Sequence, residues 1–78
     1  MAQINLMNIK QIEKNRNVIH EKVYTTYTIF EDKGKRYVQI DTYGKVNREN
    51  PEKISQSIQF DKETAKFLVK LLEKEFQL

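Results

Sequence analysis

Aromatic and basic side chains gather in one stretch, residues 24–48, and these residues have the most distinctive chemistry of the chain. Of its five aromatic rings, four share one face of the hairpin predicted below: Tyr24, Phe30, Tyr37 and Tyr43. Unstacked nucleic acid bases can lie on such rings, and each stack is worth about 1–3 kcal/mol. Five cations accompany the rings: Lys33, Lys35, Arg36, Lys45 and Arg48. Because cations attract phosphates, the combination favours a surface for single-stranded nucleic acid. The alternative is a solvated hairpin tip whose rings are simply good strand formers.

Residues suited to catalysis or metal binding are few. The chain has one histidine, His20, and no cysteine. Nucleophilic catalysis needs an activated nucleophile beside a base that a third group orients, and the sequence presents no such set. Gly34 and Gly44 stand in unrelated surroundings and form no phosphate-binding loop. We therefore expect no enzymatic activity, no metal site and no cofactor.

A β-hairpin is predicted from residue 22 to residue 43. Two runs of β-branched and aromatic residues flank the turn sequence Asp32-Lys33-Gly34-Lys35. If Lys33 and Gly34 form a two-residue turn, Gly34 supplies a positive φ. Residues whose numbers add up to 67 then face each other across the two strands.

This register sorts the hairpin into two faces. One face is largely apolar and pairs Ile29 with Val38, Tyr27 with Ile40 and Thr25 with Thr42. The other face carries the four rings together with Thr26, Thr28, Gln39 and Asp41. Hydroxyl and amide groups on this second face could hydrogen-bond base edges. A shift of one residue would mix the two sets, so the clean sorting supports the register.

A strand and a helix are predicted after a loop at residues 44–53. Residues 54–60 alternate apolar with small polar side chains, as in a half-buried strand. Asp61 is suited to cap a helix from Lys62 to about Gln77. One stripe of this helix should pack on the sheet: Ala65, Leu68, Val69, Leu72 and Phe76. A second stripe needs the N-terminal arm or another subunit as its cover, and we favour a subunit: Phe67, Leu71 and Leu78.

Length and composition bound the organisation of the chain. We expect a single α+β domain over residues 1–78, with an arm or short strand at 1–14, an antiparallel sheet at 15–60 and an amphipathic helix at 61–78. The 78 residues are 38% hydrophobic and include no cysteine, and so short a chain rarely builds a core worth more than a few kcal/mol. We therefore expect a homodimer. No apolar run approaches the roughly 20 residues of a membrane span, and no secretory signal is evident, so we expect a cytoplasmic location.

The order of hairpin, long loop, strand and C-terminal helix resembles the transcriptional coactivator positive cofactor four and its bacterial and phage relatives. The likeness covers about residues 15–77 and rests on the strings EDKGKRYVQID at 31–41 and KISQSIQFDKE at 53–63. It implies a curved antiparallel sheet of about four strands, a homodimer built across the C-terminal helices, and binding of single-stranded DNA. The family's basic turn and strand correspond to Lys33, Lys35, Arg36 and Tyr37, and its loop contacts correspond loosely to Lys45 and Arg48.

Two functions from different classes fit these features. The first is sequence-tolerant, non-enzymatic binding of single-stranded DNA, or RNA, by a homodimer. The second is a small protein-interaction module or a phage-type inhibitor of a host nuclease or defence complex, because tyrosine and arginine also dominate protein interfaces. A regulator of double-stranded DNA is disfavoured, because the chain shows no helix-turn-helix pattern.

Overall fold

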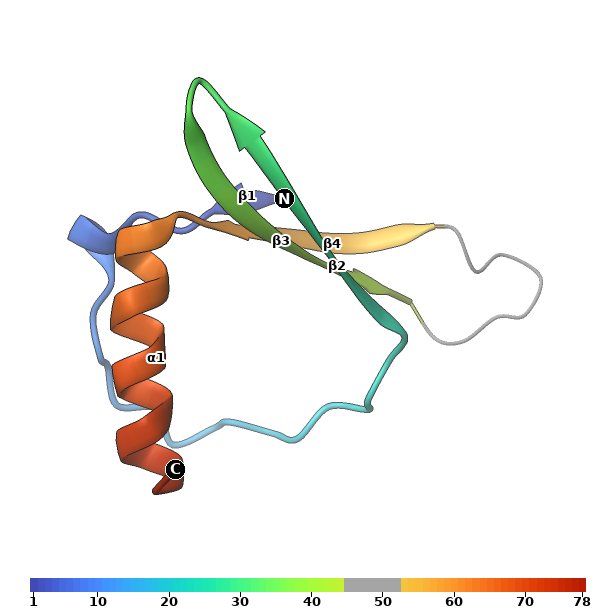
Figure 1. The fold of residues 1–78 in the computed structure, drawn as a ribbon. Helices are drawn as coiled ribbons and strands as arrows, with labels where there is room; N and C mark the ends of the chain where they lie inside the picture. Colours follow the sequence, from blue (N-terminus) through green and yellow to red (C-terminus); the bar gives the residue numbers. More distant parts are fainter. Residues whose placement is uncertain (45–52) are drawn as a thin grey trace.

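Six elements follow one another along the part of the chain that the computed structural model describes, residues 1–44 and 53–78 (Figure 1). In order, they are β1 (Ala2–Gln3), the 3-10 helix η1 (Leu6–Asn8), β2 (Thr25–Asp32), β3 (Lys35–Tyr43), β4 (Ile54–Phe60) and α1 (Lys62–Phe76). The strands form one sheet in the order β1-β4-β3-β2. The predicted α+β layout, a four-stranded sheet followed by a C-terminal helix, is confirmed.

The hairpin of β2 and β3 has the predicted register. Thr25 pairs with Thr42, and the pairing continues to the turn with partners whose numbers add up to 67. Both turn residues have positive φ, 50° at Lys33 and 77° at Gly34. A two-residue turn with positive φ at both positions matches the twist of antiparallel strands, so the turn fixes the register of every pair beyond it.

The β4 edge of the sheet differs from the expectation of an antiparallel sheet at residues 15–60. The fourth strand is β1, which runs parallel to β4 with Ala2 opposite Ile58. The N–H of Ile4 extends this pairing by donating to the carbonyl of Gln59 over 3.0 Å. The segment around Val18 and Ile19 forms no strand. Polar neighbours surround these two residues, so the segment has no apolar face to lay on the sheet.

The predicted N-cap of α1 is confirmed. The carboxylate of Asp61 accepts a hydrogen bond of 2.9 Å from the N–H of Thr64. This N–H lowers the pKa of Asp61, and the nearby charge of Lys35 acts in the same direction. Gln77 ends the helix in the left-handed conformation with φ 56°. Both helix ends therefore satisfy backbone groups that the helix itself leaves free.

Replacing Asp61 by alanine is expected to lower the melting temperature at pH 7 by a few degrees, because the first turn loses its acceptor. The pKa of Asp61 is lower in the folded chain, so its stabilisation is complete above the unfolded pKa of about 3.9 and is lost as the pH falls through the folded pKa. Thermal melts followed by circular dichroism should show the two proteins converging near pH 2. Asp61→Asn, which caps without titrating, is the control, and equal melting temperatures at pH 7 would contradict the prediction.

The prediction that one stripe of α1 packs on the sheet is wrong. α1 projects from the end of β4 and lies beside η1 (Figure 1). Val69, Leu72 and Phe76 of the stripe remain 52%, 46% and 69% exposed. The physical reason is the connection between β4 and α1, in which Asp61 alone separates strand from helix. Connections between a strand and a helix that packs on its sheet usually have about 2–6 residues, and with a single residue here the helix leads away from the sheet.

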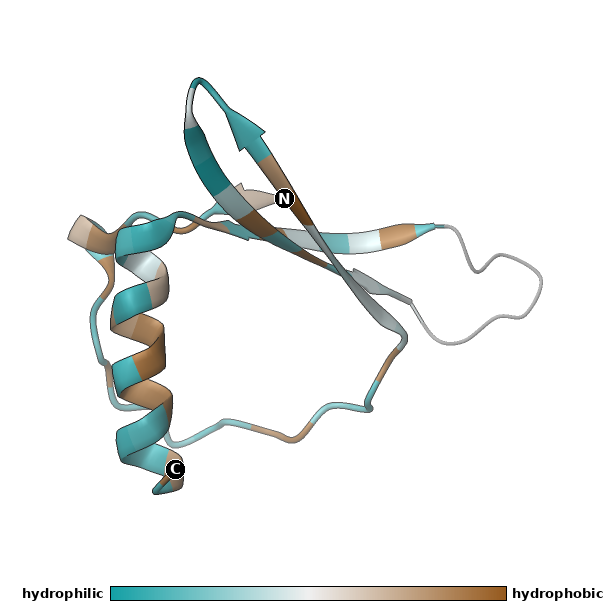
Figure 2. Ribbon diagram, in the orientation of Figure 1, coloured by the Kyte–Doolittle hydropathy of each residue, from teal (hydrophilic) through white to brown (hydrophobic). Residues whose placement is uncertain are grey.

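Apolar side chains are therefore left at the surface. Among the residues that the structure describes, no hydrophobic residue is buried, and the buried residues are Asp41, Ser57 and Thr64. Figure 2 shows apolar segments in all three long strands and along α1, without a helix laid over the sheet. A single chain thus presents its strands and its helix as separate half-covered layers.

Candidate nucleic-acid interface

Side chains along β2, β3 and β4 alternate between two faces of the sheet. The aromatic face consists of Tyr24, Thr26, Thr28, Phe30, Tyr37, Gln39, Asp41, Tyr43, Ser57 and Gln59. The apolar face consists of Tyr27, Ile29, Val38, Ile40, Ile58 and Phe60. All four predicted rings lie on the aromatic face, which makes it the candidate site.

The rings form two pairs at opposite ends of the aromatic face. Tyr24 and Tyr43 meet with their ring centroids 5.1 Å apart and their planes tilted by 49°. Phe30 and Tyr37 are stacked, with centroids 5.4 Å apart and planes at 19°. Phe30 of β2 follows Tyr24, the residue just before this strand, by six residues, which separates the pairs by roughly 20 Å. Tyr24 is 53% exposed and offers the most accessible ring of the aromatic face.

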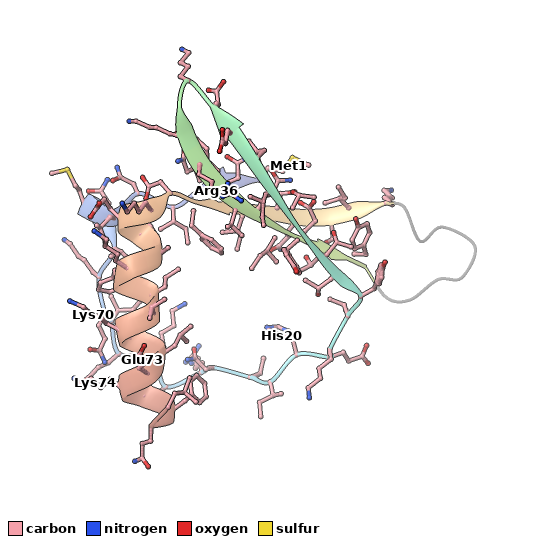
Figure 3. The ribbon with its side chains drawn as sticks, viewed as in Figure 1. Met1, His20, Arg36, Lys70, Glu73 and Lys74 are labelled. Carbon is pink, nitrogen blue, oxygen red and sulfur yellow. The ribbon has the colours of Figure 1, made fainter. Side chains whose placement is uncertain are left out.

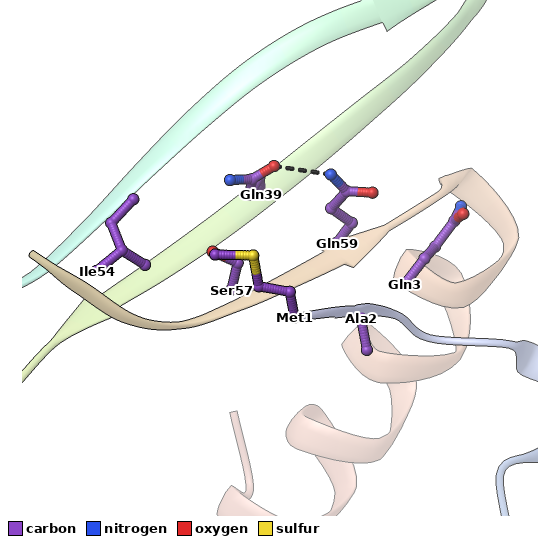
Figure 4. Close-up of a pocket in the computed structure, with 7 residues that line it drawn as sticks. All are labelled: Met1, Ala2, Gln3, Gln39, Ile54, Ser57 and Gln59. Atoms are coloured by element: carbon purple, nitrogen blue, oxygen red, sulfur yellow. Dashed lines mark hydrogen bonds between the residues drawn. The ribbon is translucent and has the colours of Figure 1, made fainter.

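A network of hydrogen-bonded polar side chains lies on the aromatic face between the two ring pairs. Gln59 donates an amide N–H to the oxygen of Gln39 over 2.8 Å (Figure 4). Gln39 in turn donates to a carboxylate oxygen of Asp41 over 2.9 Å. Ser57 donates its hydroxyl to the same oxygen over 2.5 Å. Asp41 and Ser57 are 6% and 7% exposed, so these donors satisfy a carboxylate that is nearly out of water. The network fixes the orientation of both glutamine amides.

The network was not predicted from the sequence. Asp41 was placed on this face, but its partners Ser57 and Gln59 come from β4. Ser57 pairs with Asp41 and Gln59 pairs with Gln39 in a continuous register, which shifts only between Thr42 and Tyr43. The alternation of small polar residues in 54–60 was a signal that this strand has a polar side.

A shallow hollow of about 360 Å³ adjoins the network at the β1 edge (Figure 4). Its lining combines amides, a hydroxyl and apolar groups: Met1, Ala2, Gln3, Gln39, Ile54, Ser57 and Gln59. β1 supplies the first residues of this lining because it pairs with β4 at the sheet edge. The hollow therefore places the amides of Gln39 and Gln59, which the network orients, next to the edge strand β1.

The predicted cations do not all reach the aromatic face. Lys33 lies in the turn, and Lys35 lies on the aromatic face because it is two residues from Tyr37. Arg36 is placed on the opposite face, where it pairs across the hairpin with Glu31 at 3.4 Å (Figure 3). Strand alternation is the reason, since neighbouring residues project from opposite sides of a sheet. Lys45 and Arg48 lie outside the residues that the structure describes.

The remaining predicted residues lie apart from this face. Phe67, Leu71 and Leu78, predicted at a dimer interface, are 38%, 40% and 84% exposed on or just after α1. His20 is exposed in the segment between η1 and β2 (Figure 3). Across residues 1–44 and 53–78, no three His, Asp or Glu side chains gather as metal ligands would.

Comparison with known proteins leaves the aromatic face as the main guide to function. No protein family model, no curated protein and no solved structure matches the chain. The resemblance to positive cofactor four therefore stays a prediction. Within the described ranges, no helix has the length and apolar character that crossing a membrane requires.

Proposed function

We propose that the chain binds single-stranded DNA, without strong sequence preference and without catalysis, on its aromatic face, as a homodimer in the cytoplasm. The observation that carries this proposal is the pair of ring clusters at the two ends of one hydrogen-bonded face. Rings at both ends can each take an unstacked base, and base stacking tolerates any sequence. A duplex keeps its bases stacked inside and offers nothing to these rings.

Hydrogen-bonding and charged groups support the same ligand. The amide of Gln39 has one N–H and its oxygen engaged in the network, so it meets a base edge in a fixed orientation. Lys35 lies two residues before Tyr37 on the same face and Lys33 lies in the adjoining turn, so both are placed to contact phosphates of a bound strand. Binding should therefore weaken as the salt concentration rises, because cations hold the phosphates. It should favour single strands over duplexes, because the rings stack on unpaired bases.

Fluorescence anisotropy of labelled oligo-dT of about 20 nucleotides tests this proposal. We expect submicromolar affinity that a duplex competitor does not reduce. With three to five phosphate contacts, the slope of log K against log salt should be about −2 to −3.5. A labelled oligo-U in parallel separates DNA from RNA preference. No binding at low salt, or equal competition by duplex, would overturn the proposal and direct attention to a protein partner.

A matched pair of variants sharpens the same experiment. Lys35→Ala removes a cation from the aromatic face, and Arg36→Ala removes the neighbouring cation from the apolar face. We expect Lys35→Ala to weaken oligo-dT binding and to make the salt slope shallower by about 0.7. Arg36→Ala should have the smaller effect on both quantities. Equal effects of the two variants would mean that net charge, and not the aromatic face, holds the strand.

A further inference from the structure

No element of residues 1–44 and 53–78 covers the apolar face of the sheet. Tyr27, Ile29 and Ile58 on this face are 72%, 52% and 40% exposed. The edge strand β2 contributes the most exposed of them, so the uncovered area extends to the border of the sheet. Such a patch on a small protein marks a docking surface.

α1 carries a matching surface that the described part of the chain also leaves exposed. Its stripe of Val69, Leu72 and Phe76 has the spacing of a helix that packs on a sheet. η1 lies beside the first turn of α1 only, and the rest of the helix extends past it (Figure 1). Lys70 and Lys74 point away from the space beneath the sheet (Figure 3), so the lysine side of α1 faces outward.

The two surfaces do not meet within one chain of this structure. Asp61 is the single residue between β4 and α1, and this connection sends the helix away from its own strands. Each chain therefore leaves two apolar surfaces exposed, one on the sheet and one on α1, and each surface is suited to pack against the other. In two copies related by a two-fold axis, the helix of each copy can cover the sheet of the other, so that both surfaces are buried in both copies.

We propose that the occupant of the apolar face is α1 of a second copy of this chain, so that the two copies exchange their helices. Tyr27, Ile29 and Ile58 would then contact the partner's Val69, Leu72 and Phe76. The second helical stripe, with Phe67 and Leu71, is left to pack the two helices against each other. The two stripes of α1 thus have separate partners in one interface.

The area available agrees with a stable dimer. The exposed parts of Tyr27, Ile29, Ile58, Val69, Leu72 and Phe76 amount to roughly 650 Å² per chain, given that large apolar side chains have areas of about 150–250 Å². Two chains would remove about 1,300 Å² from water, within the range of about 1,200–2,000 Å² for specific interfaces. Pairing of the second stripes adds to this area.

Cross-linking between two cysteine variants tests the exchange, because the chain has no cysteine of its own. A tagged Ile29→Cys chain is mixed and refolded with an untagged Leu72→Cys chain and treated with a bis-maleimide. We expect a cross-linked heterodimer of about twice 9.4 kDa. Lys70→Cys replaces Leu72→Cys in the control and should give far less of it, since Lys70 is on the outward side of α1.

The mass of the unmodified chain in solution completes the test. Light scattering after gel filtration should give about twice 9.4 kDa down to low micromolar concentration. A monomeric mass at every concentration, or equal cross-linking with Lys70→Cys, would overturn the helix exchange. The inference does not rest on nucleic acid binding. A dimer that cross-links as expected but ignores oligo-dT would support the helix exchange and overturn the DNA proposal. A monomer that binds oligo-dT would refute the helix exchange and the homodimer of the proposed function, and it would leave single-strand binding intact.

Discussion

Replacing Tyr37 by alanine is expected to weaken oligo-dT binding by about 5- to 150-fold, the loss of one base stack of about 1–3 kcal/mol. Tyr37 is stacked on Phe30, so the substitution also removes the ring that holds Phe30 in place. Fluorescence anisotropy at one fixed salt concentration measures the change. Tyr24→Ala should produce a loss of the same order at the other end of the face.

Tyr37→Phe is the control for this prediction because it keeps the ring and removes only the hydroxyl. Its affinity should stay close to that of the wild type. Far-ultraviolet circular dichroism and the solution mass must be unchanged in each variant, so that a lost fold is not taken for a lost contact. If Tyr37→Ala keeps both its fold and its affinity, the ring has no part in binding.

Replacing Asp41 by alanine is expected to lower the free energy of unfolding by about 1–3 kcal/mol, because it leaves buried donors without an acceptor. Ser57 and Gln39 both donate to the same oxygen of Asp41. A chain of 78 residues has only a few kcal/mol in reserve, so the variant should be close to unfolding. Urea denaturation followed by circular dichroism measures the change.

Two further variants show whether the network is responsible for that loss. Ser57→Ala removes one donor and keeps Asp41 paired with Gln39, so its effect should be smaller. Thr28→Ala changes an exposed residue of the same face and should alter stability by less than about 0.5 kcal/mol. An Asp41→Ala protein as stable as the wild type would show that the carboxylate is not a structural acceptor.

Local rules were sufficient to predict the hairpin and the start of the helix. The two-residue turn at Lys33 and Gly34 sets every pair of β2 and β3, so one correct turn fixed both faces. The cap at Asp61 depends only on its own carboxylate and the N–H of Thr64. Interactions between residues close in sequence are the ones that a single sequence can reveal.

These local rules do not predict how elements that are distant in the sequence lie relative to one another. β1 has two residues, and Ala2 and Gln3 carry no apolar alternation that would identify a parallel edge strand. The direction of α1 follows from a one-residue connection at Asp61, whereas the apolar stripe alone suggested packing on the chain's own sheet. A stripe predicts that a helix face will be covered, and it does not say by which chain.

The sequence predicted the rings of the candidate site, but it did not predict the hydrogen-bonded network between them. Alternation placed Tyr24, Phe30, Tyr37 and Tyr43 together, as the ring pairs confirm. The same alternation already separates Arg36 from Tyr37, a signal that the grouping by charge overlooked. The network of Asp41 and Ser57 needed the register of β4, which the strand pattern alone does not give.

The most direct test of the central claim is to map the bound strand by nuclear magnetic resonance. The ¹⁵N-labelled chain is titrated with unlabelled oligo-dT of about 20 nucleotides, and amide and glutamine side-chain signals are followed. The largest shifts should fall on Tyr24, Tyr37 and the Gln39 side chain, with little change at Val69 and Leu72 of α1. Shifts confined to α1, or no shifts at saturating oligo-dT, would contradict single-strand binding on the aromatic face.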